Sequence, residues 1–466
     1  MRVVVCVRQS VSGEINPFDA CAYEAALRLP GAEVILLSMG PGKAGDFLLG
    51  LTRLGAQRAV HLCDSAFAGA DTLATAYTLS LAIDRLRPQL ILCGRQTVDG
   101  DTGQVGPELS VLTGHALVTE VMELEADEQG VSTLSRDGVR RTTPYPALLT
   151  VERIYSLRLP SIRSRVGEVE LWTAADLNAD PGRIGLSGSP TRVIKTFEND
   201  QDRRKCCWIQ PHELDKVIKL SLEKSKLPAQ AERRETEGGK LPLILSVGPA
   251  PMDMAQDVGE RVQQIELEAP ERMVERIREL DPDAVLWASD APSKSCAAQV
   301  AALMRLGLCA DCTLLETDGE QLLMYRPAFS GNIIAKIRST TRPAMASVRT
   351  ASGEHAPVVV GVGMGAVAQM DAVRRWADGL GAELAATRLT VDHDHMPYPL
   401  QVGLTGKSIS PDVYVALGVS GAVHHIAGIR SSGTVIAVNQ DKDAPIFDYA
   451  DYGVIADVKD VLDALS

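Results

Sequence analysis

The segment from residue 401 to 428 combines residue types that bind nucleotides or metals. Its sequence, QVGLTGKSISPDVYVALGVSGAVHHIAG, contains the Gly406-Lys407-Ser408 ending of a phosphate loop and two adjacent histidines, His424 and His425. A Walker A loop needs a leading glycine five residues before the glycine of its Gly-Lys-Ser ending, and that position is Gln401. Neighbouring histidines on a helix point about 100° apart, which makes joint chelation of one metal difficult. We therefore expect neither a nucleotide-hydrolysing P-loop nor a paired-histidine metal site.

The same segment also shows a strand, a glycine turn and the start of a helix. Val413–Leu417 is a short apolar run, and Gly418-Val419-Ser420-Gly421 opens a helical pattern through Gly428. Free backbone N–H groups and the helix dipole at such a junction attract anions. The loop Gly94–Gly106, GRQTVDGDTGQVG, follows another apolar run and is also polar and rich in glycine. Both segments indicate nucleotide binding, with an ordinary surface loop as the alternative for the second.

Alternating strands and helices must position these segments. Short apolar runs, suited to strands buried on both faces, are separated by helical patterns such as Thr72–Leu86. In the first half these runs are Val3–Val7, Val34–Met39, Ala59–Leu62 and Leu90–Cys93. The alternation predicts an α/β fold with parallel, doubly wound sheets. Right-handed crossovers then place the ligand crevice at the carboxyl ends of the strands.

The chain of 466 residues is too long for one hydrophobic core, so several domains are expected. The charged stretch 216–240, which contains Gly238-Gly239, is the clearest boundary. We predict a nucleotide-binding domain at 1–225, a linker at 226–240, an α/β domain at 241–355 and a C-terminal nucleotide-binding α/β domain at 356–466. A hairpin is expected to turn at Asp318-Gly319.

Composition excludes several classes of function. The net charge is −13 without a dense basic patch, so no nucleic-acid partner is expected. No apolar run approaches the roughly 20 residues that span a bilayer, and the first run is too short for a signal peptide. We therefore expect a cytoplasmic protein that is not membrane-embedded. The nine cysteines are scattered, and Cys309-Ala-Asp-Cys312 lacks the second pair of a zinc site, so reduced thiols and no metal are expected.

Long segments resemble the electron transfer flavoprotein family, with its beta (small) and alpha (large) subunits fused in one chain. Residues 1–225 resemble the beta subunit through INPFDACAYEAALRL, AFAGADTLATAYTL and GRQTVDGDTGQVGPELS. Residues 241–466 resemble the alpha subunit through ADCTLL, YRPAFSGNIIAKI, QVGLTGK and GVSGAVHHIAG. The resemblance implies Rossmann-like or adenine nucleotide alpha hydrolase-like domains, a C-terminal FAD-binding α/β domain, and the equivalent of an alpha/beta heterodimer within one chain.

The resemblance implies FAD bound mainly by the C-terminal block. It places Arg388 over the flavin, Thr405 at flavin N5 and His425 rather than His424 near flavin O2, with Ser420 at the pyrophosphate. A cation over the ring favours the reduced, anionic flavin. The implied FAD-binding residues are Thr387, Arg388, Gln401, Val402, Gly403, Leu404, Thr405, Ser420, Gly421, Ala422, Val423, His424, His425, Asn439 and Asp457.

A second nucleotide is implied in the beta-like half. It is AMP in housekeeping members of the family and a second FAD in electron-bifurcating members, which oxidise NADH. The loop DGDTGQVGP resembles the bifurcating type more closely, but both alternatives stay open. The residues implied for this nucleotide are Cys6, Asn16, Met39, Gly94, Arg95, Gln96, Asp99, Asp101, Thr102 and Gln104.

The chain departs from the family pattern near the expected FAD. Leu404 stands where the family has glutamine, His424 also replaces a glutamine, and Gly363-Met364-Gly365 lacks the family's arginine. These departures put the affinity for FAD and its potential in question.

The partners implied are flavin dehydrogenases of the acyl-CoA type, as in fatty acid β-oxidation, and a quinone-reductase-type acceptor. Leu159-Pro160 matches the loop with which the family docks to dehydrogenases. No catalytic residue is expected, because an electron carrier positions its cofactor and tunes its charge. The rivals are a bifurcating NADH-oxidising flavoenzyme and a nucleotide-binding regulatory protein without a redox role.

Overall fold

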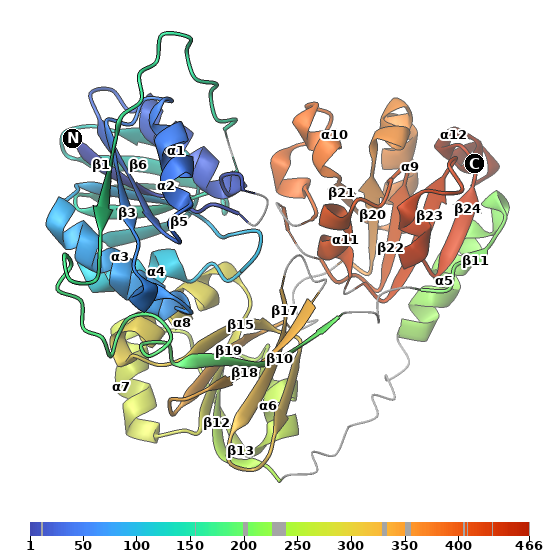
Figure 1. Ribbon diagram of the computed structural model, residues 1–466. Helices are drawn as coiled ribbons and strands as arrows, with labels where there is room; N and C mark the ends of the chain where they lie inside the picture. The colour runs from blue at the N-terminus through green and yellow to red at the C-terminus, as the bar shows by residue number, and fades with distance from the viewer. Residues whose placement is uncertain are drawn as a thin grey trace. The chain divides into compact units, whose positions relative to one another are not determined.

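The structure is a computed structural model. It describes residues 1–10, 13–153, 155–198, 204–225, 239–328, 333–349, 356–403, 406–407, 409–430 and 432–465. The described residues form two compact units (Figure 1). Unit 1 takes its residues from 1–197, 235–329 and 334–350, and unit 2 takes them from 198–234, 330–333 and 351–466. Most of the expected linker, together with Leu404 and Thr405, lies outside the described residues.

Unit 1 contains a nine-stranded sheet in the order β7-β6-β5-β8-β4-β1-β2-β3-β9. Its strands are β1 (Arg2–Cys6), β2 (Glu33–Met39), β3 (Arg58–Leu62), β4 (Leu90–Gly94), β5 (Ala116–Ala126), β6 (Gly130–Ser135), β7 (Arg140–Pro144), β8 (Ala147–Val151) and β9 (Glu168–Trp172). The helices are α1 (Pro17–Arg28), α2 (Ala44–Thr52), α3 (Thr72–Leu86) and α4 (Val105–Thr113). The four predicted strands and the predicted helix at 72–86 are thus confirmed.

Burial on both faces explains the continuous apolar runs of this sheet. Val3 and Val5 of β1 lie in a core that includes residues of α1 and α2, whereas Val4 lies in a second core with residues of α3. The predicted doubly wound architecture is confirmed. The antiparallel pairs β5–β6 and β6–β7 were not predicted, because β7 is a short, largely exposed run of polar residues without an apolar signal.

The second part of unit 1 is a five-stranded parallel sheet, in the order β13-β12-β14-β19-β15, beside a four-stranded sheet in the order β10-β18-β17-β16. The strands are β10 (Thr191–Glu198), β12 (Leu241–Val247), β13 (Gly259–Ile265), β14 (Ala284–Ala288), β15 (Leu308–Cys312), β16 (Leu314–Thr317), β17 (Leu322–Ala328), β18 (Ile333–Ser339) and β19 (Ala344–Val348). The helices are α6 (Met252–Val258), α7 (Pro270–Leu280) and α8 (Ala291–Met304). The hairpin predicted at Asp318-Gly319 is confirmed as the antiparallel pair β16–β17.

Unit 2 is a six-stranded parallel sheet in the order β11-β24-β23-β22-β20-β21. Its strands are β11 (Cys207–Trp208), β20 (Val358–Val362), β21 (Glu383–Ala386), β22 (Val413–Leu417), β23 (Thr434–Asn439) and β24 (Tyr452–Ile455). Its helices are α5 (Leu214–Ser225), α9 (Met370–Leu380), α10 (Arg388–Asp392), α11 (Val423–Ile429) and α12 (Val458–Leu465). The strand order reverses at β20, which has β21 on one side and β22 on the other.

The two strands described between residues 191 and 225 belong to other sheets than the nine-stranded one. Strand β10 extends the four-stranded sheet, and β11 extends the sheet of unit 2 beside β24. Helix α5 buries Leu214 and Ile218 in the core of unit 2. The described residues from 204 to 225 therefore pack with the C-terminal sheet, although they precede the boundary expected at residue 225.

No helix among the described residues is both long enough and apolar enough to cross a membrane. The same residues contain no group of three or more His, Cys, Asp or Glu side chains that could hold a metal ion.

One aspartate links the start of α3 to β10. Asp71 Oδ1 accepts the N–H of Ala74 at 3.0 Å, and Asp71 Oδ2 accepts the N–H and the hydroxyl of Thr191 at 3.0 and 2.7 Å. We expect Asp71→Ala to lower the free energy of unfolding of unit 1 by about 2–3 kcal/mol, since a helix cap and two further hydrogen bonds to a charged group are lost.

Urea unfolding followed by fluorescence measures this change. The control is Asp46→Ala, since Asp46 lies in the first turn of α2 without a side-chain cap bond there. Equal losses for the two variants would contradict the role given to Asp71.

Candidate functional site

In unit 2 the crevice for a ligand is expected where the strand order reverses. The loops after β20 and β22 leave the sheet toward opposite faces at this point, which is where open α/β sheets bind ligands. Gly363 follows β20, and an ideal Cβ built on it would lie 2.1 Å from the carbonyl oxygen of Gly418, which follows β22. The two loops therefore touch backbone to backbone, and only glycine fits at residue 363.

The segment after β22 presents small side chains and backbone groups to solvent. Helix α11 begins at Val423, and its first hydrogen bonds run from His425 and Ile426 to the carbonyl of Ala422. The exposed residues of this segment are Ser420, Ala422, Val423 and His424. Gly421 has a φ of +87°, and a Cβ on it would lie 2.1 Å from Ile446 N. An exposed turn of small residues at this edge of the sheet fits a phosphate group that needs close contact with the backbone.

His425 lies beneath that exposed turn. Its residue is 5% exposed, its Nε2 lies 2.8 Å from Tyr414 Oη, and its Nδ1 lies 3.1 Å from the carbonyl oxygen of Val402. Burial lowers the pKa of His425 to about 4 and raises the pKa of Tyr414. A neutral ring that donates from Nδ1–H and accepts from the tyrosine hydroxyl satisfies both contacts. The contact of His425 with the flavin stays a prediction.

Residues 402 and 403 pack against α11, so the two motifs seen in the sequence lie together. Lys407 N donates to the carbonyl of Gln401 at 2.8 Å, and Gly403 N donates to the carbonyl of Lys407 at 3.1 Å. A Cβ on Gly403, whose φ is +135°, would lie 2.7 Å from the carbonyl oxygen of His424. Leu404 and Thr405 fall between these anchored residues but lie outside the described part of the chain.

Arg388 begins α10 directly after β21. Its Nε lies 3.0 Å from Asp392 Oδ2, and both side chains are more than two-fifths exposed. Thr387 Oγ1 lies 2.9 Å from Thr390 Oγ1 and fixes the start of this helix. Asp392 offsets part of the positive charge, so Arg388 offers a partly neutralised cation at this edge of the sheet.

Asn439 and Asp457 stabilise the remaining loops at the same edge. Asn439 Nδ2 donates to the carbonyl of Val419 at 2.9 Å, and its Oδ1 accepts the N–H of Asp441 at 2.9 Å. The exposed Asp457 accepts the N–H of Lys459 at 2.8 Å, at the start of α12. Among the described residues, those expected from sequence to bind FAD thus follow β21, β22, β23 and β24, apart from 401–403, which pack against α11 and β21.

A second crevice is expected in unit 1, because the strand order reverses between β1 and β4. β1 is flanked by β2 on one side and β4 on the other, and Cys6 of β1 pairs with Cys93 of β4. Asn16 lies just before α1, donates from Nδ2 to the carbonyl of Gln96 at 2.9 Å and accepts the N–H of Val98 at 3.3 Å. Met39 ends β2 at the same edge. The loop that was expected to bind the second nucleotide is therefore anchored beside the crevice.

Several polar side chains of this loop are already engaged. Arg95 Nε lies 3.0 Å from Glu152 Oε1, and Asp99 Oδ2 lies 2.7 Å from a guanidinium nitrogen of Arg8. Gln96 donates to Asp101, which has a φ of +53°. Arg8 and Glu152 were not predicted as partners, because each lies far along the chain from the residue that it contacts.

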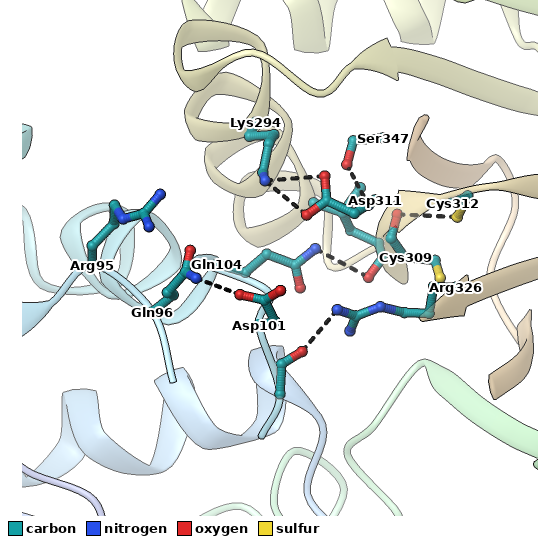
Figure 2. A network of polar contacts seen from close by, with 12 residues as sticks. Arg95, Gln96, Asp101, Gln104, Lys294, Cys309, Asp311, Cys312, Arg326 and Ser347 are labelled. Carbon is teal, nitrogen blue, oxygen red and sulfur yellow. Dashed lines mark hydrogen bonds and ion pairs between the residues drawn. The ribbon is translucent and has the colours of Figure 1, made fainter. Parts of the chain in front are cut away.

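The second part of unit 1 contacts this loop (Figure 2). Gln104 donates to the carbonyl of Leu308 at 3.3 Å, and Arg326 donates to the carbonyl of Gly100 at 2.7 Å. Burial and the nearby carboxylate of Asp311 raise the pKa of Asp101. Thr102, which was also predicted to bind the second nucleotide, is half-buried within the loop. The loop is thus held from both parts of unit 1.

The predicted docking residues lie in an exposed segment. Leu159 is 88% exposed and is followed by the exposed Pro160, and the nearby Ile162 is fully exposed. An exposed leucine on a surface segment fits a partner that binds transiently.

Family models match most of the chain. The electron transfer flavoprotein domain matches residues 3–177 and 268–374, and the electron transfer flavoprotein FAD-binding domain matches residues 354–430. The chain belongs to the electron transfer flavoprotein family. It carries beta-like and alpha-like halves in one chain, its function is electron transfer, and its FAD-binding domain is the C-terminal one.

Relatives of both subunits are similar to the chain. It is 40% identical over 201 residues to the electron transfer flavoprotein subunit beta of Clostridium acetobutylicum, which covers 41% of this chain and 78% of that subunit. It is 33% identical over 237 residues to the subunit alpha of Thermoanaerobacterium thermosaccharolyticum, covering 41% of this chain and 72% of that subunit. CarD, a subunit of the caffeyl-CoA reductase–Etf complex of Acetobacterium woodii, is 36% identical over 204 residues, covering 41% of this chain and 78% of CarD.

The pKa of His425 predicts a pH-dependent stability of unit 2. The unfolded chain binds more protons than the folded one between about pH 4 and 6.5, so acidification destabilises the fold. We expect the free energy of unfolding to fall by about 3 kcal/mol through this group as the pH drops from 7 to 4. His425→Gln should remove this contribution.

Urea unfolding at several pH values measures the slope for the native chain and the variant. His424→Gln, a change at the exposed neighbour, serves as the matched control and should keep the native slope. An unchanged slope in His425→Gln would show that this ring is not buried in its neutral form.

Proposed function

We propose that this chain is a single-chain electron carrier that accepts electrons from flavin dehydrogenases of the acyl-CoA type and passes them to a quinone-reductase-type acceptor. Bound FAD would supply the redox chemistry, by taking up and releasing electrons at its ring. The observation that carries the proposal is the backbone contact of Gly363 with Gly418 at the strand-order reversal, inside the part of the chain that is matched as an FAD-binding domain.

Different residues of the crevice would bind different parts of FAD. Ser420–His424 would bind the pyrophosphate, since this exposed turn offers backbone N–H groups and little steric bulk. Arg388 would lie near the ring and favour its reduced form by Coulomb attraction, which Asp392 moderates. Gln401, Val402 and Gly403 would place Thr405 at the ring, because they are anchored to α11 and β21.

We also propose a second nucleotide, AMP or FAD, in the crevice between β1 and β4. The loop 94–104 supports it, because this loop is rich in glycine and hydroxyl groups and follows a parallel strand at a reversal of strand order. A second FAD would make the chain a bifurcating NADH-oxidising flavoprotein. Residues 1–225 and 241–466 are proposed as the equivalents of the two subunits, with the FAD domain from residue 356, and the cytoplasm as the site of action.

The similarity to CarD supports a partner enzyme that acts on a CoA thioester. That relative belongs to a complex with a reductase of a CoA thioester. The donor proposed for this chain is a flavin dehydrogenase acting on the same class of substrate.

The nucleotides released from the purified native chain test the proposal. We expect a yellow protein that yields either one FAD and one AMP, or two FAD, per chain, by absorbance spectroscopy and chromatography of the acid extract. One FAD alone would overturn the second nucleotide. A colourless chain that stays colourless after incubation with FAD would overturn the carrier and favour a regulatory nucleotide-binding protein.

Docking through Leu159 gives a separate test. Leu159→Asp puts a charge on the exposed apolar anchor, so we expect the rate of flavin reduction by an acyl-CoA dehydrogenase with its substrate to fall about tenfold or more. The FAD content should not change. Leu186→Asp, at another exposed leucine of unit 1, is the matched control. Equal rates for the two variants would exclude docking at Leu159.

A further inference from the structure

Asp19 is a buried carboxylate at the crevice of unit 1. It lies in the first turn of α1, is 6% exposed, and follows the loop anchor Asn16 by one helical turn. None of the roles described so far involves Asp19, although burying a carboxylate costs free energy of folding unless its oxygens are hydrogen-bonded.

The two oxygens of Asp19 join two different loops. Oδ2 accepts the N–H of Arg8 at 2.8 Å, in the segment that follows β1. Oδ1 accepts the N–H of Gly94 at 3.2 Å, at the end of β4. These segments form the two sides of the crevice, because β1 and β4 are the neighbours at which the strand order reverses. One side chain therefore spans the base of the crevice.

The surroundings of Asp19 fit this contact closely. A Cβ on Gly94 would lie 2.3 Å from Asp19 Oδ1, so any side chain at residue 94 would push the carboxylate away. Asn16 repeats the pattern one turn earlier, through its bonds to Gln96 and Val98 of the same loop. The start of α1 thus holds both ends of the loop's first half.

The carboxylate has no ion-pair partner among the described residues. The guanidinium of Arg8 pairs with Asp99 instead, at 2.7 Å, and Arg95 pairs with Glu152. The strands contribute the thiols of Cys6 and Cys93, and the hydrogen bond with Cys6 together with burial raises the pKa of Cys93. Burial also raises the pKa of Asp19 to about 7, against the pull of its backbone hydrogen bonds.

We propose that Asp19 is a positioning residue for the second nucleotide: its carboxylate holds the loop after β4 against the segment after β1 and so sets the width of the crevice. The inference rests on the proposed second nucleotide. Ionised Asp19 accepts both N–H groups, whereas the protonated acid loses one acceptor and frees one side of the crevice. Protonation of Asp19 therefore makes retention of the nucleotide depend on pH near neutrality, and Asp19→Asn separates this dependence from that of Asp101, whose pKa is also raised.

The experiment measures the release of each nucleotide from the native full-length chain and from Asp19→Asn, at about pH 8 and about pH 6. Asparagine keeps the size of the side chain but replaces one acceptor with an NH₂ group that faces an N–H donor. We expect native release of the second nucleotide to be about tenfold faster at the lower pH. Asp19→Asn should release it rapidly at both pH values and keep its FAD in unit 2.

Asp64→Asn is the matched control. Asp64 also accepts two backbone N–H groups from separate segments, Ala66 and Ala174, each at 3.0 Å, at the end of β3. This variant should lose comparable local hydrogen bonds and retain the second nucleotide as the native chain does.

The outcomes separate the two proposals. A native chain with two nucleotides, and native-like release from Asp19→Asn, would overturn the role of Asp19 alone. A native chain that holds only one FAD would overturn the second nucleotide, and this inference with it. If Asp19→Asn fails to fold, the test is the rate at which the native chain releases the second nucleotide at the two pH values. Equal rates would overturn the inference.

Discussion

Neighbouring parallel strands that send their chains to opposite faces of a sheet leave almost no room for side chains where they part. Both crevices of this chain obey that constraint. At β20 and β22 the missing side chain of Gly363 admits the carbonyl of Gly418, and at β1 and β4 the missing side chain of Gly94 admits the carboxylate of Asp19. The first crevice is closed at its base by backbone alone, whereas the second is closed by an ionisable group. The two reversals of strand order thus share one geometry, and they differ in the chemistry of the group that fills the space.

The two parts of unit 1 share a local conformation in which the N–H of a left-handed acidic residue donates to a hydroxyl of the adjacent strand. Glu120 and Asp311 have φ values of +55° and +56°, and the N–H of each donates to a hydroxyl of the adjacent strand, Thr150 at 3.0 Å and Ser347 at 2.9 Å. One family domain matches both parts. The electrostatics differ: burial raises the pKa of Glu120, whereas Lys294 and Arg349 overcome burial and lower the pKa of Asp311. Figure 2 shows the ammonium of Lys294 at the carboxylate of Asp311. The same backbone conformation therefore places a carboxyl group with a raised pKa in one part and a carboxyl group with a lowered pKa in the other.

Strands buried on both faces were predictable from sequence, since runs such as Leu90–Cys93 and Val413–Leu417 need no long-range information. The glycine loops after them were predictable too, because glycine and strand ends are local signals. The partners of those loops were not. Arg95 is held by Glu152, and His425 by Tyr414 and Val402, through contacts that only the tertiary fold creates. The destination of α5 was also hidden, because its amphipathic pattern shows which face is buried and not which sheet covers it.

Helix α5 carries a consequence for biosynthesis. Its apolar residues Leu214 and Ile218 pack with β20 and β22, strands that leave the ribosome only after the whole second part of unit 1. The nascent chain must therefore keep an amphipathic helix without its sheet while another domain folds in between, a delay that exposes it to chaperones and to misassembly. Two separate subunits would face this problem as a search between molecules. In the fused chain, α5 waits only until β20 and β22 have been translated, because they belong to the same chain.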